Sequence, residues 1–202
     1  MISAMPVALI LSYPLLVHLA VWSELPVIQI LALLVLALGL LLPGLRQGSR
    51  FTWGLFLVIL ALLCAAGYLD ITIYLLYLPP IVMPLLFWGV FFHSLLPGKV
   101  PLVTAIGEWA RGPLSAQMRR YTRGVTLMWM VVFAVMALWA ALLSWLASAM
   151  LWSLFTNFIN YLLIVLLFVA EFVYRKWRFQ DHDHPGFLDY LKIVVNADIR
   201  KR

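Results

Sequence analysis

A few polar side chains lie within long apolar stretches of this sequence, where they can do chemistry. Glu171 and Asn160 lie in the last such stretch, and His93 lies near the end of an earlier one. A polar or ionisable group inside a membrane span is costly to desolvate, so each of these residues is a candidate functional residue. If these three side chains met near one membrane face, they could modify a lipid substrate, with His93 acting as the general base.

The same side chains also have a structural interpretation. Arg175 follows Glu171 at i+4, so the two can form an ion pair that snorkels to the membrane surface. Asn157 and Asn160 share one helical face and can hydrogen-bond to a neighbouring helix as packing contacts. His93 can be an ordinary packing histidine. We favour this interpretation, which assigns no catalytic residue and leaves His93, Glu171 and Asn160 as weak candidates.

A cluster of arginines suggests a binding site of another kind. Arg119, Arg120 and Arg123 lie close together between two apolar stretches. Such a cluster attracts the phosphates of anionic lipids, or an acidic protein such as an acyl carrier protein. Arginines that only determine the membrane topology of the chain, with ordinary lipid contact, would form the same cluster in the sequence. We predict that these three residues bind anionic lipid or a carrier protein.

Known catalytic and metal-binding motifs are missing from the sequence. It contains no Gly-x-Ser-x-Gly elbow, no His-Glu-x-x-His site and no P-loop. The single cysteine, Cys64, excludes a Cys-x-x-Cys pair. The run 181–184 alternates Asp and His, and we interpret it as a solvated linker rather than a metal site. We therefore expect no metal and no cofactor.

The composition is that of a polytopic membrane protein. Of the 202 residues, 65% are hydrophobic and 11% are charged, whereas globular domains have roughly 45–50% apolar and about 25% charged residues. A helix needs about 20 apolar residues to cross a hydrocarbon core of about 30 Å. Six stretches suit such helices: 5–22, 27–43, 53–69, 71–96, 125–147 and 151–174. The sequence thus predicts an all-α fold with six transmembrane helices.

The basic residues predict how these spans are oriented. In a six-span arrangement all 14 lysines and arginines fall on one side of the membrane, and the positive-inside rule makes that side the cytoplasm. Both termini are then cytoplasmic. Residues 1–174 form the transmembrane domain, with a cytoplasmic loop at 97–124, and residues 175–202 form a basic tail. The net charge of +6 therefore reflects topology, and we expect no nucleic-acid partner.

Two cytoplasmic segments have the pattern of interfacial amphipathic helices. Leu102, Ile106 and Trp109 recur at helical spacing, with polar residues including Thr104 and Glu108 off that face. Ser115 can cap a second helix that carries the arginines and continues into the fifth span. In the tail, apolar residues over 187–195 follow a similar helical pattern.

The prolines of the fourth span allow two structures. Pro79, Pro80 and Pro84 each remove a backbone donor from the helix. Inside a membrane the freed carbonyls must be satisfied by neighbouring helices or by water. The span is therefore either a packed, kinked helix or a broken helix that lines a cavity.

Several runs of residues resemble one bacterial family. The runs are Arg120-Tyr121-Thr122-Arg123-Gly124-Val125-Thr126 with Trp129, Trp152-Ser153-Leu154-Phe155-Thr156-Asn157, Asn160-Tyr161, and 171–178. They are similar to those of an uncharacterised family of multi-spanning inner-membrane proteins encoded near aryl-polyene and fatty-acid-like synthesis genes. The resemblance covers roughly the C-terminal half. It implies the bacterial inner membrane and a role near an acyl or polyene lipid pathway.

Two functions fit these observations. The first is a non-enzymatic accessory that docks lipid-synthesis enzymes or an acyl carrier protein at the membrane, or helps to transport an acyl lipid. The alternative is an integral-membrane acyl-lipid-modifying transferase with its site near the cytoplasmic face. We favour the accessory because no catalytic motif is visible. A cavity shared by His93 and Glu171 would favour the transferase.

Reporter fusions test the predicted topology. A reporter that fluoresces only in the cytoplasm should be bright when fused within 46–50, at Gly112 or at Arg202, because these positions follow an even number of spans. It should be dark at Glu24, Asp70 and Ser148. A bright signal at Ser148 would contradict the six-span arrangement.

Overall fold

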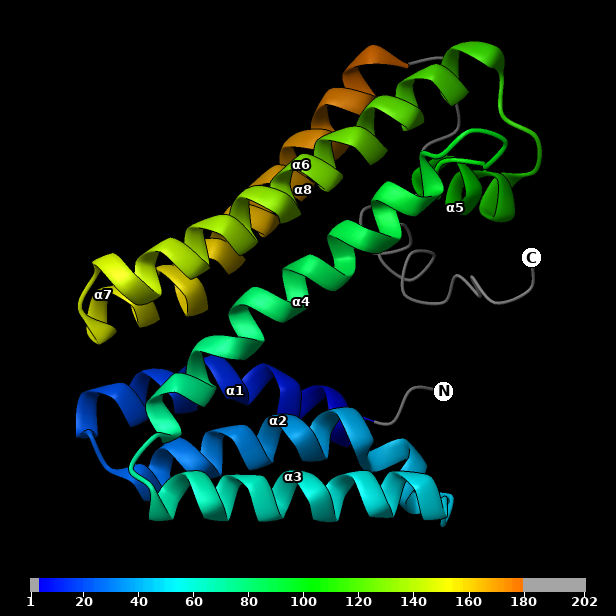
Figure 1. Ribbon diagram of the computed structural model, residues 1–202. Helices are drawn as coiled ribbons and strands as arrows, with labels where there is room; N and C mark the ends of the chain where they lie inside the picture. The colour runs from blue at the N-terminus through cyan, green and yellow to red at the C-terminus, as the bar shows by residue number, and fades with distance from the viewer. Residues whose placement is uncertain (1–3, 180–202) are drawn as a thin grey trace. The chain divides into compact units, whose positions relative to one another are not determined.

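The computed structural model describes residues 4–179, which form helices joined by short turns (Figure 1). No strand occurs within this range, so the predicted all-α fold is confirmed. The helices are α1 (Ala4–Ser23), α2 (Pro26–Arg46), α3 (Arg50–Tyr68), α4 (Thr72–Ser94), α5 (Leu102–Arg111), α6 (Ala116–Leu146), α7 (Ala149–Leu154), the π-helix η1 (Phe155–Ile159) and α8 (Asn160–Arg178).

Six helices of the described chain are long and apolar enough to cross a membrane. They are α1, α2, α3, α4, α6 and the continuous helix Ala149–Arg178, which contains α7, η1 and α8. These helices lie where the six apolar stretches predicted them, and the chain is a multi-pass membrane protein. The π-helical turn inside the last span is a feature that the apolar pattern did not predict.

Turns with left-handed backbone join α1 to α2 and α3 to α4. Glu24 has φ of 56° and Asp70 has φ of 54°. This conformation is unfavourable for a residue with a Cβ, although aspartate tolerates it better than most. Such tight reversals keep the connections between these spans to a few residues. Each of these two turns therefore joins its pair of spans within a few residues.

The fourth span remains helical through its prolines. α4 runs without interruption from Thr72 to Ser94, which contradicts the alternative of a broken helix.

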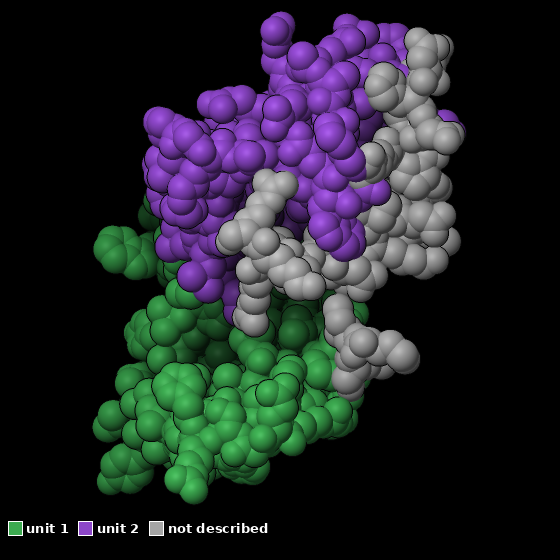
Figure 2. Space-filling view, turned by 90° about the vertical axis from the view of Figure 1, so that its right-hand side faces the viewer, with its two compact units in different colours: residues 1–82, 138–161 green, residues 83–137, 162–202 purple. Residues whose placement is uncertain are grey.

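The chain packs as two compact units, shown in different colours in Figure 2. Unit 1 comprises Met1–Val82 and Leu138–Tyr161, and unit 2 comprises Met83–Ala137 and Leu162–Arg202. The core of unit 1 gathers Val17, Ala20, Leu76 and Trp152, all fully buried.

The core of unit 2 is aromatic. Phe133 of α6 lies 5.2 Å from Phe87 and 5.5 Å from Phe91 of α4, measured between ring centroids. Trp129 of α6 lies 6.1 Å from Phe168 of α8. Aromatic pairs at such separations add to the stability gained by burying the rings. These contacts hold α4, α6 and α8 together in unit 2.

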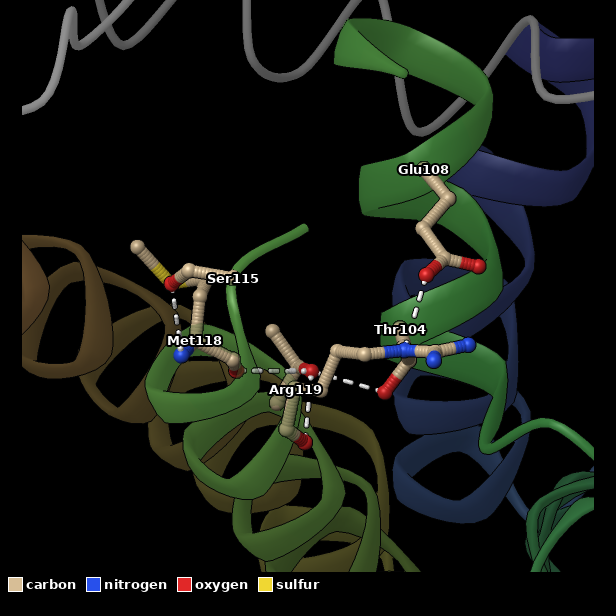
Figure 3. A network of polar contacts seen from close by, with 6 residues as sticks. Thr104, Glu108, Ser115, Met118 and Arg119 are labelled. Atoms are coloured by element: carbon tan, nitrogen blue, oxygen red, sulfur yellow. Dashed lines mark hydrogen bonds and ion pairs between the residues drawn. The ribbon is translucent and has the colours of Figure 1, made fainter. Parts of the chain in front are cut away.

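Hydrogen bonds and an ion pair attach α5 to the start of α6 (Figure 3). The hydroxyl oxygens of Thr104 and Thr122 are 2.7 Å apart, and Arg119 Nε lies 2.9 Å from Glu108 Oε1. The backbone N–H of Val103 donates to Thr126 Oγ1 at 3.2 Å. The polar face of α5 therefore faces the protein.

The amphipathic helix predicted from residue 102 is present, but its apolar residues do not all share one environment. Trp109 is 53% exposed, as expected of a residue at a lipid surface, whereas Leu102 is buried. Ser115 Oγ accepts a hydrogen bond from the backbone N–H of Met118 at 3.3 Å (Figure 3). Ser115 thus caps α6 as predicted, and the arginine-bearing helix is the first part of α6 itself. The predicted tail helix at 187–195 lies outside the described residues.

Candidate functional site

A pocket of about 440 Å³ lies between α6 and α8 in unit 2. Its wall is mainly apolar, and the lining residues are Arg120, Tyr121, Gly124, Val125, Met128, Leu167, Ala170, Glu171 and Tyr174. We call this pocket the α6–α8 groove. Gly124 helps to keep it open, because no atom lies within 4 Å of the position that a Cβ would take there.

Glu171 is held in the wall of the groove by two partners. The Tyr121 hydroxyl donates a hydrogen bond to Glu171 Oε1 at 3.1 Å, and Arg175 Nε lies 3.6 Å from the same oxygen. The side chains of Glu171 and Arg175 are only 7% and 11% exposed. Burying a carboxylate is costly unless it is paired and hydrogen-bonded. The ion pair predicted at i+4 is therefore present, but it is buried rather than exposed at the surface.

Aromatic rings surround this ion pair. Tyr121 lies 6.0 Å from Tyr174 and 5.2 Å from Phe179, measured between ring centroids. The guanidinium carbon of Arg175 lies 5.8 Å from the centre of the Phe172 ring, within the range of a cation–π contact. These contacts hold Tyr121 and Arg175, the two partners of the Glu171 carboxylate.

The three predicted binding arginines have different surroundings. All three are exposed on the first turns of α6. Arg119 pairs with Glu108 and so takes part in holding α5. Arg120 lines the groove. Arg123 follows Arg120 at i+3, on the same side of the helix, and it is exposed.

The three weak catalytic candidates are not assembled into one site within unit 2. His93 is exposed at the end of α4, where its Nε2 lies 2.6 Å from Lys99 Nζ. The groove beside Glu171 is not lined by His93. Asn160 belongs to unit 1 and is 5% exposed. His93 and Glu171 therefore do not line this groove together, so the observation that would favour the transferase is not made here.

Two groove residues escaped the functional analysis of the sequence. Tyr121 and Gly124 appeared there only within a run of residues resembling a family. Tyrosine and glycine are common in membrane helices, so neither residue type signals a binding site. Their roles follow from the packing of α6 against α8, which brings Tyr121 to a carboxylate 50 residues later in the chain.

Within residues 4–179, no group of three or more His, Cys, Asp or Glu side chains is placed to hold a metal ion. The Asp and His run at 181–184 lies outside the described residues, so its interpretation as a linker stays a prediction.

No protein-family model matches the chain, and comparisons with curated proteins and with solved structures found no match. The chemistry of the groove is therefore the guide to its ligand. Apolar side chains within two membrane-spanning helices suit a hydrocarbon chain, and Arg120 supplies a positive charge to the same groove. This combination fits an amphiphile with an anionic head group.

Replacing Glu171 tests whether its buried contacts matter. Glu171→Gln keeps the shape but removes the charge, and hydrogen bonds to charged groups are stronger than neutral ones by about 1 kcal/mol. We expect the midpoint of thermal unfolding in detergent to fall by about 2–4 °C, the shift that 1 kcal/mol gives at this chain length. Glu171→Leu, which also leaves the Tyr121 hydroxyl without its acceptor, should lower the midpoint further.

Glu24→Gln is the matched control, because Glu24 is exposed in a turn. It should melt like the wild type. If Glu171→Gln and Glu171→Leu also melted like the wild type, the buried pair would contribute nothing to stability.

Proposed function

We propose that this protein is a bacterial inner-membrane accessory that holds an acyl-bearing anionic lipid in the α6–α8 groove and catalyses no reaction itself. In this proposal the groove opens on the cytoplasmic side of the membrane, and both termini are cytoplasmic. The resemblance of the C-terminal half suggests that the lipid belongs to an acyl or aryl-polyene synthesis pathway.

The observation that carries the proposal is an apolar groove with a positive charge in its wall. Val125 and Met128 from α6 and Leu167 and Ala170 from α8 offer an apolar surface to an acyl chain. Arg120 lines the same groove and can contact a phosphate. Each arginine near an anionic membrane surface contributes about 1 kcal/mol to binding.

The pairing of charges supports this assignment. Glu171 is paired with Arg175, and Arg119 is paired with Glu108. Arg120 and Arg123 make no ion pair with any residue of the described range. Their charges are therefore available to an anionic ligand, whereas the charge of Glu171 is already balanced and does not repel it.

An acidic acyl carrier protein is a second partner that these arginines could attract. Electrostatic attraction of this kind mainly speeds association and depends strongly on salt. A carrier protein would use the exposed charges of Arg120 and Arg123 but not the apolar groove. A substitution inside the groove therefore distinguishes a lipid ligand from a carrier protein.

A double substitution tests the two arginines. Arg120→Gln with Arg123→Gln should weaken binding to vesicles of anionic phosphatidylglycerol by about 10- to 30-fold at low salt, since two contacts of about 1 kcal/mol are lost. Raising the salt concentration should weaken binding by the wild type and hardly affect the variant. Binding can be measured by titrating protein in nanodiscs with labelled lipid.

Arg119→Gln is the matched control, because Arg119 is already paired with Glu108. It should change lipid binding no more than about twofold, well under the loss of one full contact. Equal losses in both variants would show a diffuse surface charge rather than a site.

The pathway role needs a test in cells. A strain lacking the protein should have an altered profile of acyl or polyene lipids, and the double arginine variant should fail to restore it at a matched protein level. An unchanged lipid profile in the deletion strain would contradict the proposed pathway, whatever the vesicle measurements show.

A further inference from the structure

The α6–α8 groove is polar at one end and apolar at the other. On α6, Arg120 and Tyr121 come before the apolar residues that line the groove, and on α8, Glu171 and Tyr174 come after them. A short turn joins the far ends of these helices, so α6 and α8 run in opposite directions. The hydrogen bond from Tyr121 to Glu171 shows that the polar residues of both helices meet at the same end of the groove.

The lengths of the two helices place this polar end relative to the bilayer. α6 has 31 residues, and the continuous helix Ala149–Arg178 has 30. At about 1.5 Å per residue, each helix is about 45 Å long, whereas the hydrocarbon core is about 30 Å thick. All charged residues of both helices lie toward the polar end of the groove. This end therefore extends past the hydrocarbon core, to the depth of the lipid head groups.

Glu171 presents a hydrogen-bond acceptor at this depth. Its two partners contact the same carboxylate oxygen: the Tyr121 hydroxyl donates to Oε1 at 3.1 Å, and Arg175 Nε lies 3.6 Å from Oε1. The second oxygen, Oε2, accepts no hydrogen bond from residues 4–179, and it is not one of their fully enclosed polar atoms. A carboxylate can accept about four hydrogen bonds. Glu171 therefore lines the groove with an oxygen that can accept one from a bound molecule.

The neighbouring charges indicate which kind of donor suits this oxygen. Arg175 already balances the charge of Glu171. An ammonium group would add a second positive charge beside that of Arg175, whereas a hydroxyl donates a hydrogen bond without adding charge. Arg120 lines the same groove and can contact a phosphate. A phosphate and a hydroxyl within one head group are the chemistry of a polyol phosphodiester.

We propose that the α6–α8 groove selects lipids whose phosphodiester head group carries a hydroxyl, with the phosphate at Arg120 and the hydroxyl donating to Glu171 Oε2. Hydrogen bonds to a charged acceptor are stronger than neutral ones, so this contact can discriminate between head groups. The inference rests on the proposed function, which requires only an anionic lipid and gives Glu171 no contact with it. Glycerol and sugar phosphodiesters belong to the selected class.

Two lipids that differ only in their hydroxyls test the selection. Phosphatidylglycerol and phosphatidylpropanol with the same acyl chains have equal charge and a three-carbon head group, but phosphatidylpropanol has no hydroxyl. Labelled forms would be titrated against the full-length protein in phosphatidylcholine nanodiscs. The wild type should bind phosphatidylglycerol about tenfold more tightly, the value of one hydrogen bond to a charged group. Equal affinity for the two lipids would overturn the inference, and so would phosphatidylethanolamine binding as tightly as phosphatidylglycerol.

Two variants assign the selection to Glu171. Glu171→Gln keeps the shape of the side chain but offers only a neutral acceptor, so the preference should fall to about threefold or less. Arg120→Gln is the control: it should weaken binding of both lipids about fivefold and leave the tenfold preference intact. Because the preference is a ratio, a loss of stability in either variant affects both lipids equally. An unchanged preference in Glu171→Gln would contradict the role given to this carboxylate.

The inference and the proposed function can fail separately. If Arg120→Gln weakens binding of both lipids but the wild type does not distinguish them, the groove binds anionic lipid without recognising a hydroxyl, and only the inference falls. If the wild type binds neither lipid, the proposed function falls and the inference falls with it.

Discussion

Hydrocarbon cannot hydrogen-bond a polar group, so each polar side chain in a membrane span needs a partner within the protein or a bound molecule. Glu171 meets this requirement through Tyr121 and Arg175. The π-helical turn meets it through Thr156 and Asn157. The features that distinguish this chain from six plain apolar helices are thus the places where polar groups had to be satisfied.

The same requirement determines which charges are available at the arginine end of α6. Glu108 is used to attach α5 through Arg119, and Glu171 is used within the wall of the groove. These two acidic residues each pair with a basic one, whereas within residues 4–179 no ion pair involves Arg120 or Arg123. An apolar groove with Arg120 in its lining suits an anionic amphiphile. The proposed function thus follows from pairing within the protein rather than from the number of basic residues.

Local patterns predicted the parts of the fold that depend on neighbouring residues. The lengths of the apolar stretches predicted the six spans, and the position of Ser115 predicted the cap of α6. Contacts between distant residues were not predictable in this way, because the rotation of each helix about its axis decides which side chains meet. The hydrophobic spacing predicted that Leu102 and Trp109 share one lipid-facing side of the helix. In the structure Trp109 is exposed but Leu102 is buried, because hydrogen bonds of Val103 and Thr104 hold this end of α5 against α6. Likewise, nothing local to Glu171 indicates that Tyr121 contacts it.

The central claim is that the α6–α8 groove holds the acyl chain of an anionic lipid, and photocrosslinking tests it most directly. A phosphatidylglycerol analogue with a diazirine in its acyl chain should label peptides containing Met128 and Leu167. Gly124→Leu should reduce this labelling several-fold, because Gly124 lines the groove and has open space for a side chain. Gly89→Leu, which also has open space on its helix, should label like the wild type. Equal labelling of all three proteins, or equal labelling by a phosphatidylcholine analogue with the same chain, would contradict the account.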